Sequence, residues 1–267
     1  MKIKFLGTGS AQTSLNRFHS SFLISSSNHN LLVDCGDGIS KAILKQNINF
    51  NSIDSILISH FHADHYSGLP SLITQMKLLS RKNDLTIFVH SSEKDFLEDF
   101  IFHSYLFKER MTFNLIIVSF DEGKEVLLSD DLKFTSKFNS HLDKYKRASL
   151  ETSPLREKEL GFTSLSFLFK DDENSVNYSG DIGSQNDLYL FNEKVDWFIT
   201  ETTHIKSEEL LGLINKLDPA KLILTHIGDD FEKPLYDFHK SLPEHLKSRI
   251  IIAFDGLELN QSTQNPL

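Results

Sequence analysis

The sequence has a single cysteine, Cys35, among its 267 residues. A disulfide within the chain is therefore impossible, and a zinc site built on several thiolates is excluded. The chain also lacks any apolar run near the roughly 18 residues that a membrane-spanning helix needs. Its apolar start, "MKIKFL", reaches glycines too soon for a signal peptide. We therefore expect a cytoplasmic protein with no membrane segment.

Positive charge is scarce as well, because 28 Lys and Arg stand against 37 Asp and Glu and give a net charge of −9. Such a chain lacks the basic surface that holds a nucleic-acid backbone by charge alone, so nucleic acid is not favoured as a partner, although it is not excluded. Any charge that binds a phosphate must be local, such as a bound metal ion. With 39% hydrophobic and 24% charged residues, the composition is that of a globular protein.

No proline-rich linker, serine-rich linker or fixed repeat interrupts the chain, which favours one domain over 1–267. Hydrophobic periodicity predicts strands over 2–7, 20–25, 30–36, 55–60, 85–90, 114–120, 124–129, 132–141, 163–170, 175–181, 195–203, 221–227 and 249–259. It predicts helices over 39–47, 68–80, 93–107, 207–217 and 235–242. Two β-rich halves, each followed by helices, predict an α/β protein in which two packed sheets lie between helices, a four-layer αββα sandwich.

Potential metal ligands crowd into "SHFHADH", residues 59–65. Residues two apart in a strand point to the same side, so we expect His60 and His62 to converge on one cation. Asp64 and His65 come in the turn that follows and can face a second cation. Imidazole and carboxylate are the usual ligands of zinc and also suit iron and manganese.

Three further strand ends offer ligands, and their residues are His141, Asp181 and His226. We assign His60, His62 and His141 to a first metal ion, Asp64, His65 and His226 to a second, and the Asp181 carboxylate to a bridge between them. Two divalent ions are implied, with Zn²⁺ favoured and Mn²⁺ or Fe as alternatives. A hydroxide between such ions stays ionised near neutral pH and is the expected nucleophile.

The motif H-x-H-x-D-H, followed by His141, Asp181 and His226 in that order, resembles the metallo-β-lactamase superfamily. The stretches "FLGTGSAQ", "LLVDCGDG", "YSGD", "LILTHI" and "AFDGLEL" are most similar to ribonuclease Z and its small phosphodiesterase relatives. The resemblance covers nearly the whole chain and implies an αββα fold, a dinuclear zinc-type centre and attack on a phosphodiester. Asp181 stands where some β-lactamases carry cysteine, and His62 where flavodiiron oxygen reductases carry glutamate, which argues against both branches.

Two departures from ribonuclease Z concern the substrate. Thr200 in "ITETTHI" stands where that family has a histidine, so we expect His204 to be the general acid instead, unless it is only a surface histidine. Asp64 and His204 are thus the candidate catalytic residues. Only 181 − 141 = 40 positions separate His141 from Asp181. The long RNA-gripping arm is therefore missing, and the charged loop 142–159 can at most form a lid.

These features predict a metal-dependent hydrolase that acts on a small cyclic or nucleotide-like phosphodiester. The alternatives are a transfer RNA 3′ endonuclease of the ribonuclease Z type, a lactone or thioester hydrolase, and a non-catalytic metal-binding protein of the same fold. The helix over 93–107 belongs either to the core or to a homodimer surface. Asp34 and Asp255 either orient a ligand histidine or simply end a strand in a turn.

Overall fold

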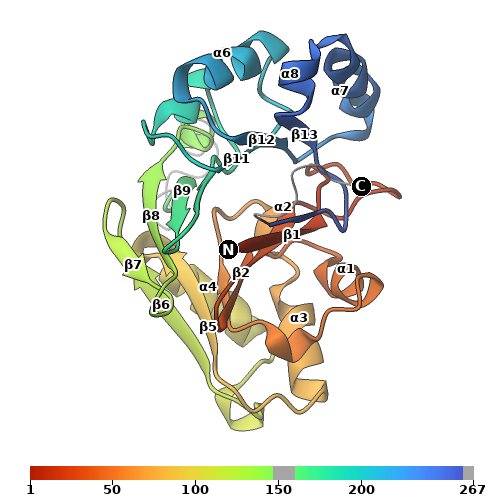
Figure 1. Cartoon of the computed structure of the whole chain (residues 1–267). Helices are drawn as coiled ribbons and strands as arrows, with labels where there is room; N and C mark the ends of the chain where they lie inside the picture. The colour runs from red at the N-terminus through yellow and green to blue at the C-terminus, as the bar shows by residue number, and fades with distance from the viewer. Residues whose placement is uncertain (147–159, 261–267) are drawn as a thin grey trace.

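The computed structural model describes residues 1–146 and 160–260. Two mixed seven-stranded sheets pack face to face, and helices cover the outer side of each sheet (Figure 1). This is the four-layer αββα arrangement expected from the sequence. The greater part of the predicted lid, 147–159, lies outside the described residues.

The first sheet holds the N-terminal half of the chain and the last strand, in the order β14-β1-β2-β3-β4-β5-β6. Its strands are β1 (Lys2–Gly7), β2 (Ser21–Ser26), β3 (His29–Val33), β4 (Ser55–Leu57), β5 (Leu85–His90), β6 (Leu115–Phe120) and β14 (Glu258–Leu259). β14 pairs antiparallel with β1, so that Leu259 lies opposite Ile3. The chain therefore returns to its first half after it has completed the second sheet.

The second sheet has the order β13-β12-β11-β10-β9-β8-β7. Its strands are β7 (Glu125–Leu127), β8 (Lys133–Phe138), β9 (Leu165–Lys170), β10 (Ser175–Tyr178), β11 (Trp197–Thr200), β12 (Lys221–Leu224) and β13 (Ile250–Ile252). β10 to β13 are parallel neighbours. Their carboxyl ends therefore meet at one edge of the sheet, the usual place for a site in a parallel sheet.

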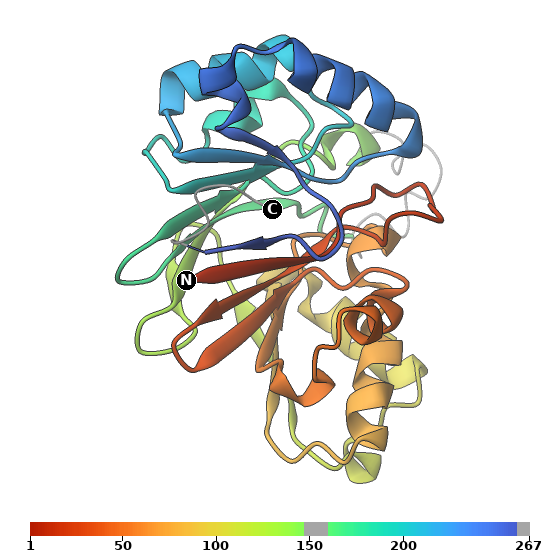
Figure 2. The ribbon, with the colours of Figure 1, turned by 45° about the vertical axis from the view of Figure 1, so that its right-hand side comes forward.

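Helices α1 to α4 flank the first sheet and α6 to α8 flank the second (Figure 2). Their bounds are α1 (Ile39–Lys45), α2 (Ala63–Tyr66), α3 (Leu69–Leu78), α4 (Lys94–His103), α6 (Ser207–Leu217), α7 (Asp229–Ser241) and α8 (Glu244–Lys247). Short 3₁₀ helices are η1 (Phe50–Ser52), η2 (Ser91–Glu93), η3 (Lys108–Arg110) and η5 (Gln185–Tyr189). Within the described ranges, no helix has the length and apolar character to cross a membrane.

The observed helix ends can be compared with those predicted from hydrophobic periodicity. In α6 the buried residues Leu210, Leu213, Ile214 and Leu217 follow the helical repeat, and both predicted ends are confirmed. The predicted end of α4 at 107 is wrong, because the helix stops at His103 and Tyr105 takes a left-handed φ of 58°. The predicted start of α7 at 235 is also wrong. That helix begins at Asp229, where its first turn carries acidic side chains that favour a helix N-terminus.

The apolar core has three parts. One cluster lies between the two sheets and includes Phe22 of the first sheet together with Phe134, Phe167 and Tyr178 of the second. The other two lie under the helices of each half. Burial of each large side chain contributes on the order of 1.5–3 kcal/mol. The shared middle layer holds the two sheets in a fixed relation, which any site built from both of them requires.

Candidate metal centre

The loop after β4 carries the first potential ligands. β4 ends at Leu57 rather than at 60, because the Ser59 N–H leaves the ladder and donates to the Asp34 carboxylate at 2.8 Å. The strand alternation predicted for His60 and His62 is therefore wrong. His60 lies beyond the strand, and His62 is the residue before α2. The two rings nevertheless meet, with centroids 4.8 Å apart.

Asp64 and His65 lie in the one-turn helix α2, not in an open turn. The backbone N–H of Cys35 donates to the carbonyl of His65 at 2.7 Å and ties this helix to the end of the first sheet. Gly36 permits the approach, because a Cβ there would lie 1.9 Å from the Asp64 carbonyl oxygen. Both side chains are buried and are held on a short helix that is fixed to the first sheet.

The remaining potential ligands follow three strands of the second sheet. His141 comes after β8, Asp181 after β10 and His226 after β12, each a few residues beyond the strand end. A Cβ at Gly183 would lie 2.3 Å from the Ser140 carbonyl oxygen, so glycine lets the two loops touch. His226 has a positive φ of 54°, a strained conformation of the kind found at functional sites.

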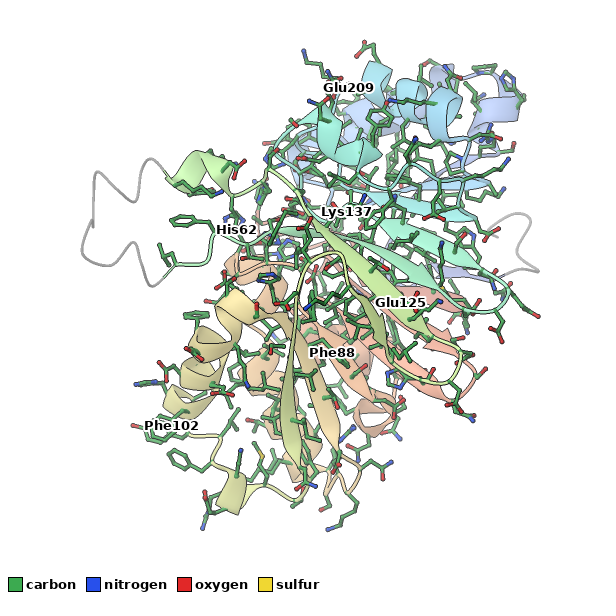
Figure 3. The ribbon with its side chains drawn as sticks, turned by 90° about the vertical axis from the view of Figure 1, so that its left-hand side faces the viewer. His62, Phe88, Phe102, Glu125, Lys137 and Glu209 are labelled. Carbon is green, nitrogen blue, oxygen red and sulfur yellow. The ribbon has the colours of Figure 1, made fainter. Side chains whose placement is uncertain are left out.

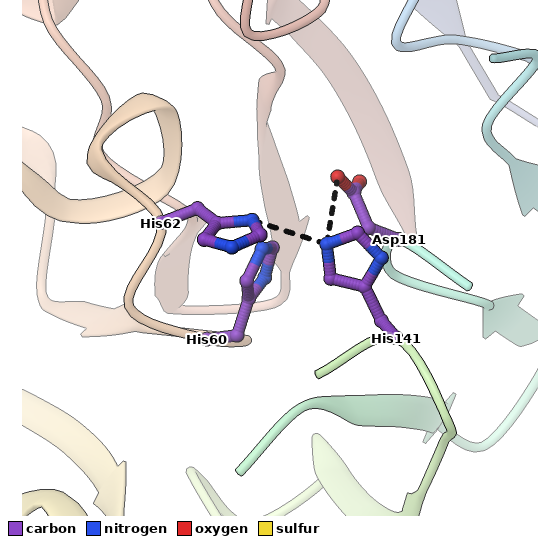
Figure 4. A group of neighbouring side chains, drawn as sticks. All are labelled: His60, His62, His141 and Asp181. Atoms are coloured by element: carbon purple, nitrogen blue, oxygen red, sulfur yellow. Dashed lines mark hydrogen bonds and ion pairs between the residues drawn. The ribbon is translucent and has the colours of Figure 1, made fainter. Parts of the chain in front are cut away.

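The first group of these residues, called the histidine cluster below, consists of His60, His62, His141 and Asp181 (Figure 4). One ligand atom of each member lies within 4.8 Å of the others. His141 Nε2 is 3.0 Å from His62 Nδ1 and 3.8 Å from the Asp181 carboxylate. Figure 3 places His62 where the two halves of the molecule meet.

The second group, called the carboxylate cluster below, consists of Asp64, His65, Asp181 and His226, all of them buried. His226 Nε2 lies 3.2 Å from both Asp64 Oδ2 and Asp181 Oδ2. His65 Nε2 lies 3.3 Å and 3.5 Å from the same two atoms. Asp181 belongs to both clusters, and the grouping matches the division predicted from the sequence.

The pKa values of the imidazoles shift in opposite directions in the two clusters. Burial lowers the pKa of His60 well below its usual value and lowers that of His141 to about 4. Burial opposes charge on His65 and His226 as well, but there the carboxylates, Asp181 foremost, outweigh it and raise both pKa values. A hydrogen bond from His226 and the charge of nearby His65 outweigh burial and hold the pKa of Asp64 below its usual range.

The donor set fits divalent cations. His60 Nε2 and His65 Nε2 are buried and have no hydrogen-bond partner within the described part of the chain. Buried polar atoms rarely lack a hydrogen-bond partner, so these two unpaired nitrogens need an explanation. Imidazole nitrogens and carboxylate oxygens that converge within 4.8 Å are the ligands and spacing of a zinc-type site. The two clusters are therefore consistent with a dinuclear metal site.

The Asp34 carboxylate orients one of the potential ligands. It accepts a hydrogen bond from His65 Nδ1 at 2.8 Å and from the Ser59 hydroxyl at 2.9 Å. Asp34 has a left-handed φ of 61°, as Asp tolerates better than most residues. Asp255 has a different task, because it accepts from the Thr8 hydroxyl and the Phe18 N–H. Of the two aspartates, Asp34 is thus the one that touches a site histidine.

His204 forms a pair with Glu201. Its Nδ1 lies 2.7 Å from Glu201 Oε1, and this hydrogen bond raises the pKa of His204. Thr203 also donates its hydroxyl to Glu201, which is 1% exposed. The His204 ring meets His141 edge-on, with centroids 5.4 Å apart. Thr200 is fully buried and accepts from the Ser179 hydroxyl, so it packs in β11.

A cavity of about 620 Å³ opens over both clusters. Five potential ligands line it, namely His62, Asp64, His141, Asp181 and His226. The other lining residues are Ser10, Ala11, Thr13, His19, Asp37, Ala63, Ser67, Lys144, Tyr145, Thr203 and His204. Lys144 is the only lysine or arginine among these described lining residues. The centroids of the Tyr145 and His62 rings are 5.3 Å apart, and Tyr145 is 43% exposed. The cavity has the size of a small-molecule site.

Sequence reasoning did not assign a role to Glu201, Ser59, Tyr178 or Lys144. The role of Glu201 could have been predicted from its position three residues before His204 in "ITETTHI". The role of Tyr178 could not be predicted from a sequence pattern, because its hydroxyl contacts Asp34 across 144 positions of sequence. Contacts of that kind need the packed sheets.

Residues 1–241 match the family model of the Anti-Pycsar protein Apyc1. The chain belongs to the Apyc1 family. With the buried His and Asp clusters, membership makes it a metal-dependent hydrolase of the metallo-β-lactamase fold. The predicted superfamily is confirmed.

Curated relatives of this Apyc1-family chain include ribonucleases Z. That of Methanosarcina mazei is 40% identical over 100 residues, which are 38% of this chain and 33% of the relative. That of Saccharolobus solfataricus is 41% identical over 97 residues, which are 36% and 33% of the two chains. The match thus spans about a third of the length of these relatives.

Solved structures share the fold over almost the whole chain. The metallo-β-lactamase fold protein YhfI from Bacillus subtilis has a TM-score of 0.74 at 19% identity and covers 97% of this chain and 98% of its own. Human tRNase Z, short form, has a TM-score of 0.69 at 19% identity, with 97% and 99% covered. A diphosphatase from the PhnP family has a TM-score of 0.65 at 18% identity, with 97% of each chain covered.

Proposed function

We propose that this protein is a phosphodiesterase that hydrolyses a small cyclic nucleotide. The observation that carries the proposal is the pair of clusters sharing Asp181, set at the base of a cavity of about 620 Å³. The cavity suits one small ligand rather than a folded nucleic acid. Membership of the Apyc1 family supports a cyclic nucleotide as that ligand.

His60, His62 and His141 would hold one divalent ion, Asp64, His65 and His226 the other, and Asp181 both. When bound, the two ions supply Lewis-acid charge for the phosphate and lower the pKa of water to give a nucleophile at neutral pH. Zn²⁺ is the favoured ion, and Mn²⁺ or Fe would fit the same ligands. The buried Asp34 carboxylate orients one of these residues, His65, because it accepts from His65 Nδ1 at 2.8 Å.

His204 is the proposed general acid. Because Glu201 Oε1 accepts from Nδ1, the opposite nitrogen of the ring remains available to a substrate. Water bonds to phosphorus and releases one proton, one ester P–O bond of the ring breaks, and the departing oxygen takes a proton from His204 Nε2. The proton released by the water restores His204, so a cyclic diester and water give a monoester with atoms and charge balanced. Lys144 at the cavity wall adds positive charge for an anionic substrate.

Ribonuclease Z activity is the second candidate, favoured by the 40% identity over 100 residues. The net charge of −9 and the single lysine or arginine among the described cavity residues oppose it. A precursor transfer RNA makes many phosphate contacts, and Lys and Arg supply the electrostatic part of that binding.

The test is a substrate panel given to the metal-loaded protein. It comprises a purine and a pyrimidine 3′,5′-cyclic mononucleotide, bis(p-nitrophenyl) phosphate, a lactone, a thioester and a precursor transfer RNA. We expect turnover of the cyclic nucleotides and loss of that turnover in Asp181→Ala. Cleavage of the lactone or thioester alone would show that the protein is a lactone or thioester hydrolase and not a phosphodiesterase. Cleavage of the RNA alone would favour the second candidate.

We also propose that 1–267 forms one domain, because the middle core layer contains side chains of both halves. The cytoplasmic location expected from the sequence stays a prediction, and the homodimer stays one of the two alternatives for the helix over 93–107.

A further inference from the structure

A tyrosine hydroxyl lies in the apolar layer between the two sheets. Tyr178, the last residue of β10, is 2% exposed and belongs to the core cluster there. Its ring meets Phe22 of the first sheet edge-on, with centroids 5.0 Å apart. A phenylalanine would fill this place equally well, and a buried hydroxyl is costly unless it is hydrogen-bonded. The hydroxyl therefore needs an explanation beyond packing.

The partner of that hydroxyl is the Asp34 carboxylate at the end of the first sheet. Tyr178 donates to Asp34 Oδ2 at 2.9 Å. The same oxygen accepts from the Ser59 hydroxyl at 2.9 Å and from His65 Nδ1 at 2.8 Å. Asp34 is fully buried, so solvent does not replace any of these donors. Its position thus depends on the protein groups that donate to it.

The hydrogen bond from His65 Nδ1 to Asp34 fixes the face that His65 presents to the site. With Nδ1 as the donor, Nε2 points toward the carboxylate cluster, 3.3 Å from Asp64 and 3.5 Å from Asp181. A partner of this kind sets both the tautomer and the ring orientation of a metal-binding histidine. Any shift of Asp34 therefore changes the ligand that His65 offers.

The geometry points to Tyr178 as a positioning residue for the carboxylate cluster, acting on His65 through Asp34. The end of β10 then contributes two residues to the proposed metal centre, Tyr178 and, three positions later, Asp181 (181 − 178 = 3). One rigid strand end of the second sheet supplies the shared ligand and also the hydroxyl that holds a ligand of the first sheet in place. This inference rests on the proposed metal centre but not on the proposed substrate.

The test measures ion binding by the whole chain, with Tyr178→Phe beside wild type. Both are titrated with Zn²⁺ against a competing chelator, and with Co²⁺, whose absorption reports the ligand geometry of each ion. We expect one of the two ions to bind about tenfold more weakly in Tyr178→Phe and its Co²⁺ spectrum to change, with the other ion unaffected. The metal-free Tyr178→Phe protein should stay folded, with its melting temperature lowered only by the loss of this one buried hydrogen bond.

Two further variants make the result specific. Tyr189→Phe removes a hydroxyl from η5, where the ring packs under Lys216, and should bind both ions as wild type does. Ser59→Ala removes another donor to Asp34 and also the contact of 3.1 Å to His60 Nδ1, so it should weaken both ions.

Two ions held equally tightly by wild type and Tyr178→Phe would overturn this inference and leave the metal centre standing. Absence of ion binding in wild type would overturn both. Weakening of both ions to the same extent in Tyr178→Phe would also contradict the inference, because it would indicate a general loosening of the core.

Discussion

The histidine cluster and the carboxylate cluster share Asp181 but place different charge around a bound ion. Three imidazoles with lowered pKa values make up the rest of the first, so they offer neutral lone pairs. The second adds Asp64 to the shared carboxylate and contains imidazoles whose pKa is raised. Nitrogen ligands suit zinc-type ions, and additional carboxylate oxygen makes a site more tolerant of Mn²⁺. The two positions should therefore differ in ion preference.

The two clusters differ in their support as well. His65 of the carboxylate cluster is fixed by Asp34, and through it by Ser59 and Tyr178. The histidine cluster lies beside the Glu201–His204 pair through the edge contact of His141. The buried network around Asp34 thus supports the carboxylate cluster, and the ring of the proposed general acid contacts the histidine cluster.

The largest loss of activity is expected at Asp181, because this residue belongs to both clusters. Asp181→Ala should lower turnover at least about 10³-fold, since several kcal/mol of charge stabilisation depend on bound ions. Ion content by elemental analysis and the rate on a cyclic nucleotide check this result. Asp172→Ala, in the exposed turn between β9 and β10, is the matched control and should behave as wild type. Wild-type turnover in Asp181→Ala would show that the two clusters do not catalyse the reaction.

Loss of the proposed acid should cost about 10²-fold in kcat on a cyclic nucleotide, because its leaving alkoxide needs a proton. His204→Ala is the variant, and bis(p-nitrophenyl) phosphate is the control substrate, since p-nitrophenolate leaves without protonation. A much smaller loss on that ester supports the assignment. Equal losses on both substrates would mean that His204 serves structure or binding instead.

Single-cluster variants sharpen the comparison directly. His141→Ala removes an imidazole from the histidine cluster, and His226→Ala removes one from the carboxylate cluster. Each variant should retain one ion per chain instead of two, with the retained ion weakened by no more than about tenfold through the shared carboxylate. Competition of Zn²⁺ with Mn²⁺ should show better Mn²⁺ binding in His141→Ala. Loss of both ions in both variants would show that the clusters act as one site.

The smallest effect concerns the cavity wall. Lys144→Ala should raise KM a few-fold and leave kcat nearly unchanged, because an exposed lysine adds roughly 1 kcal/mol or less to the binding of an anion. Steady-state kinetics at low and high salt check this, and the difference from wild type should shrink at high salt. A kcat that falls as far as it does in His204→Ala would give Lys144 a part in the chemical step.

The two clusters of potential ligands were predictable from sequence because polar residues that follow strands ending at the same sheet edge lie close together. That rule found His141, Asp181 and His226, although the strand geometry predicted for His60 and His62 was wrong. The rule does not find Tyr178, which acts from inside the core, or the pairing of Thr8 with Asp255 across 247 positions. Such contacts depend on how two sheets pack, and periodicity within one strand carries no information about that.

The most direct measurement is hydrolysis of a 3′,5′-cyclic mononucleotide by protein whose bound ions have been counted in the same sample. We predict two ions per chain and conversion of the cyclic diester to the monoester, with both lost in Asp181→Ala. A chain that holds two ions and leaves every cyclic nucleotide and phosphodiester intact would contradict the proposed function.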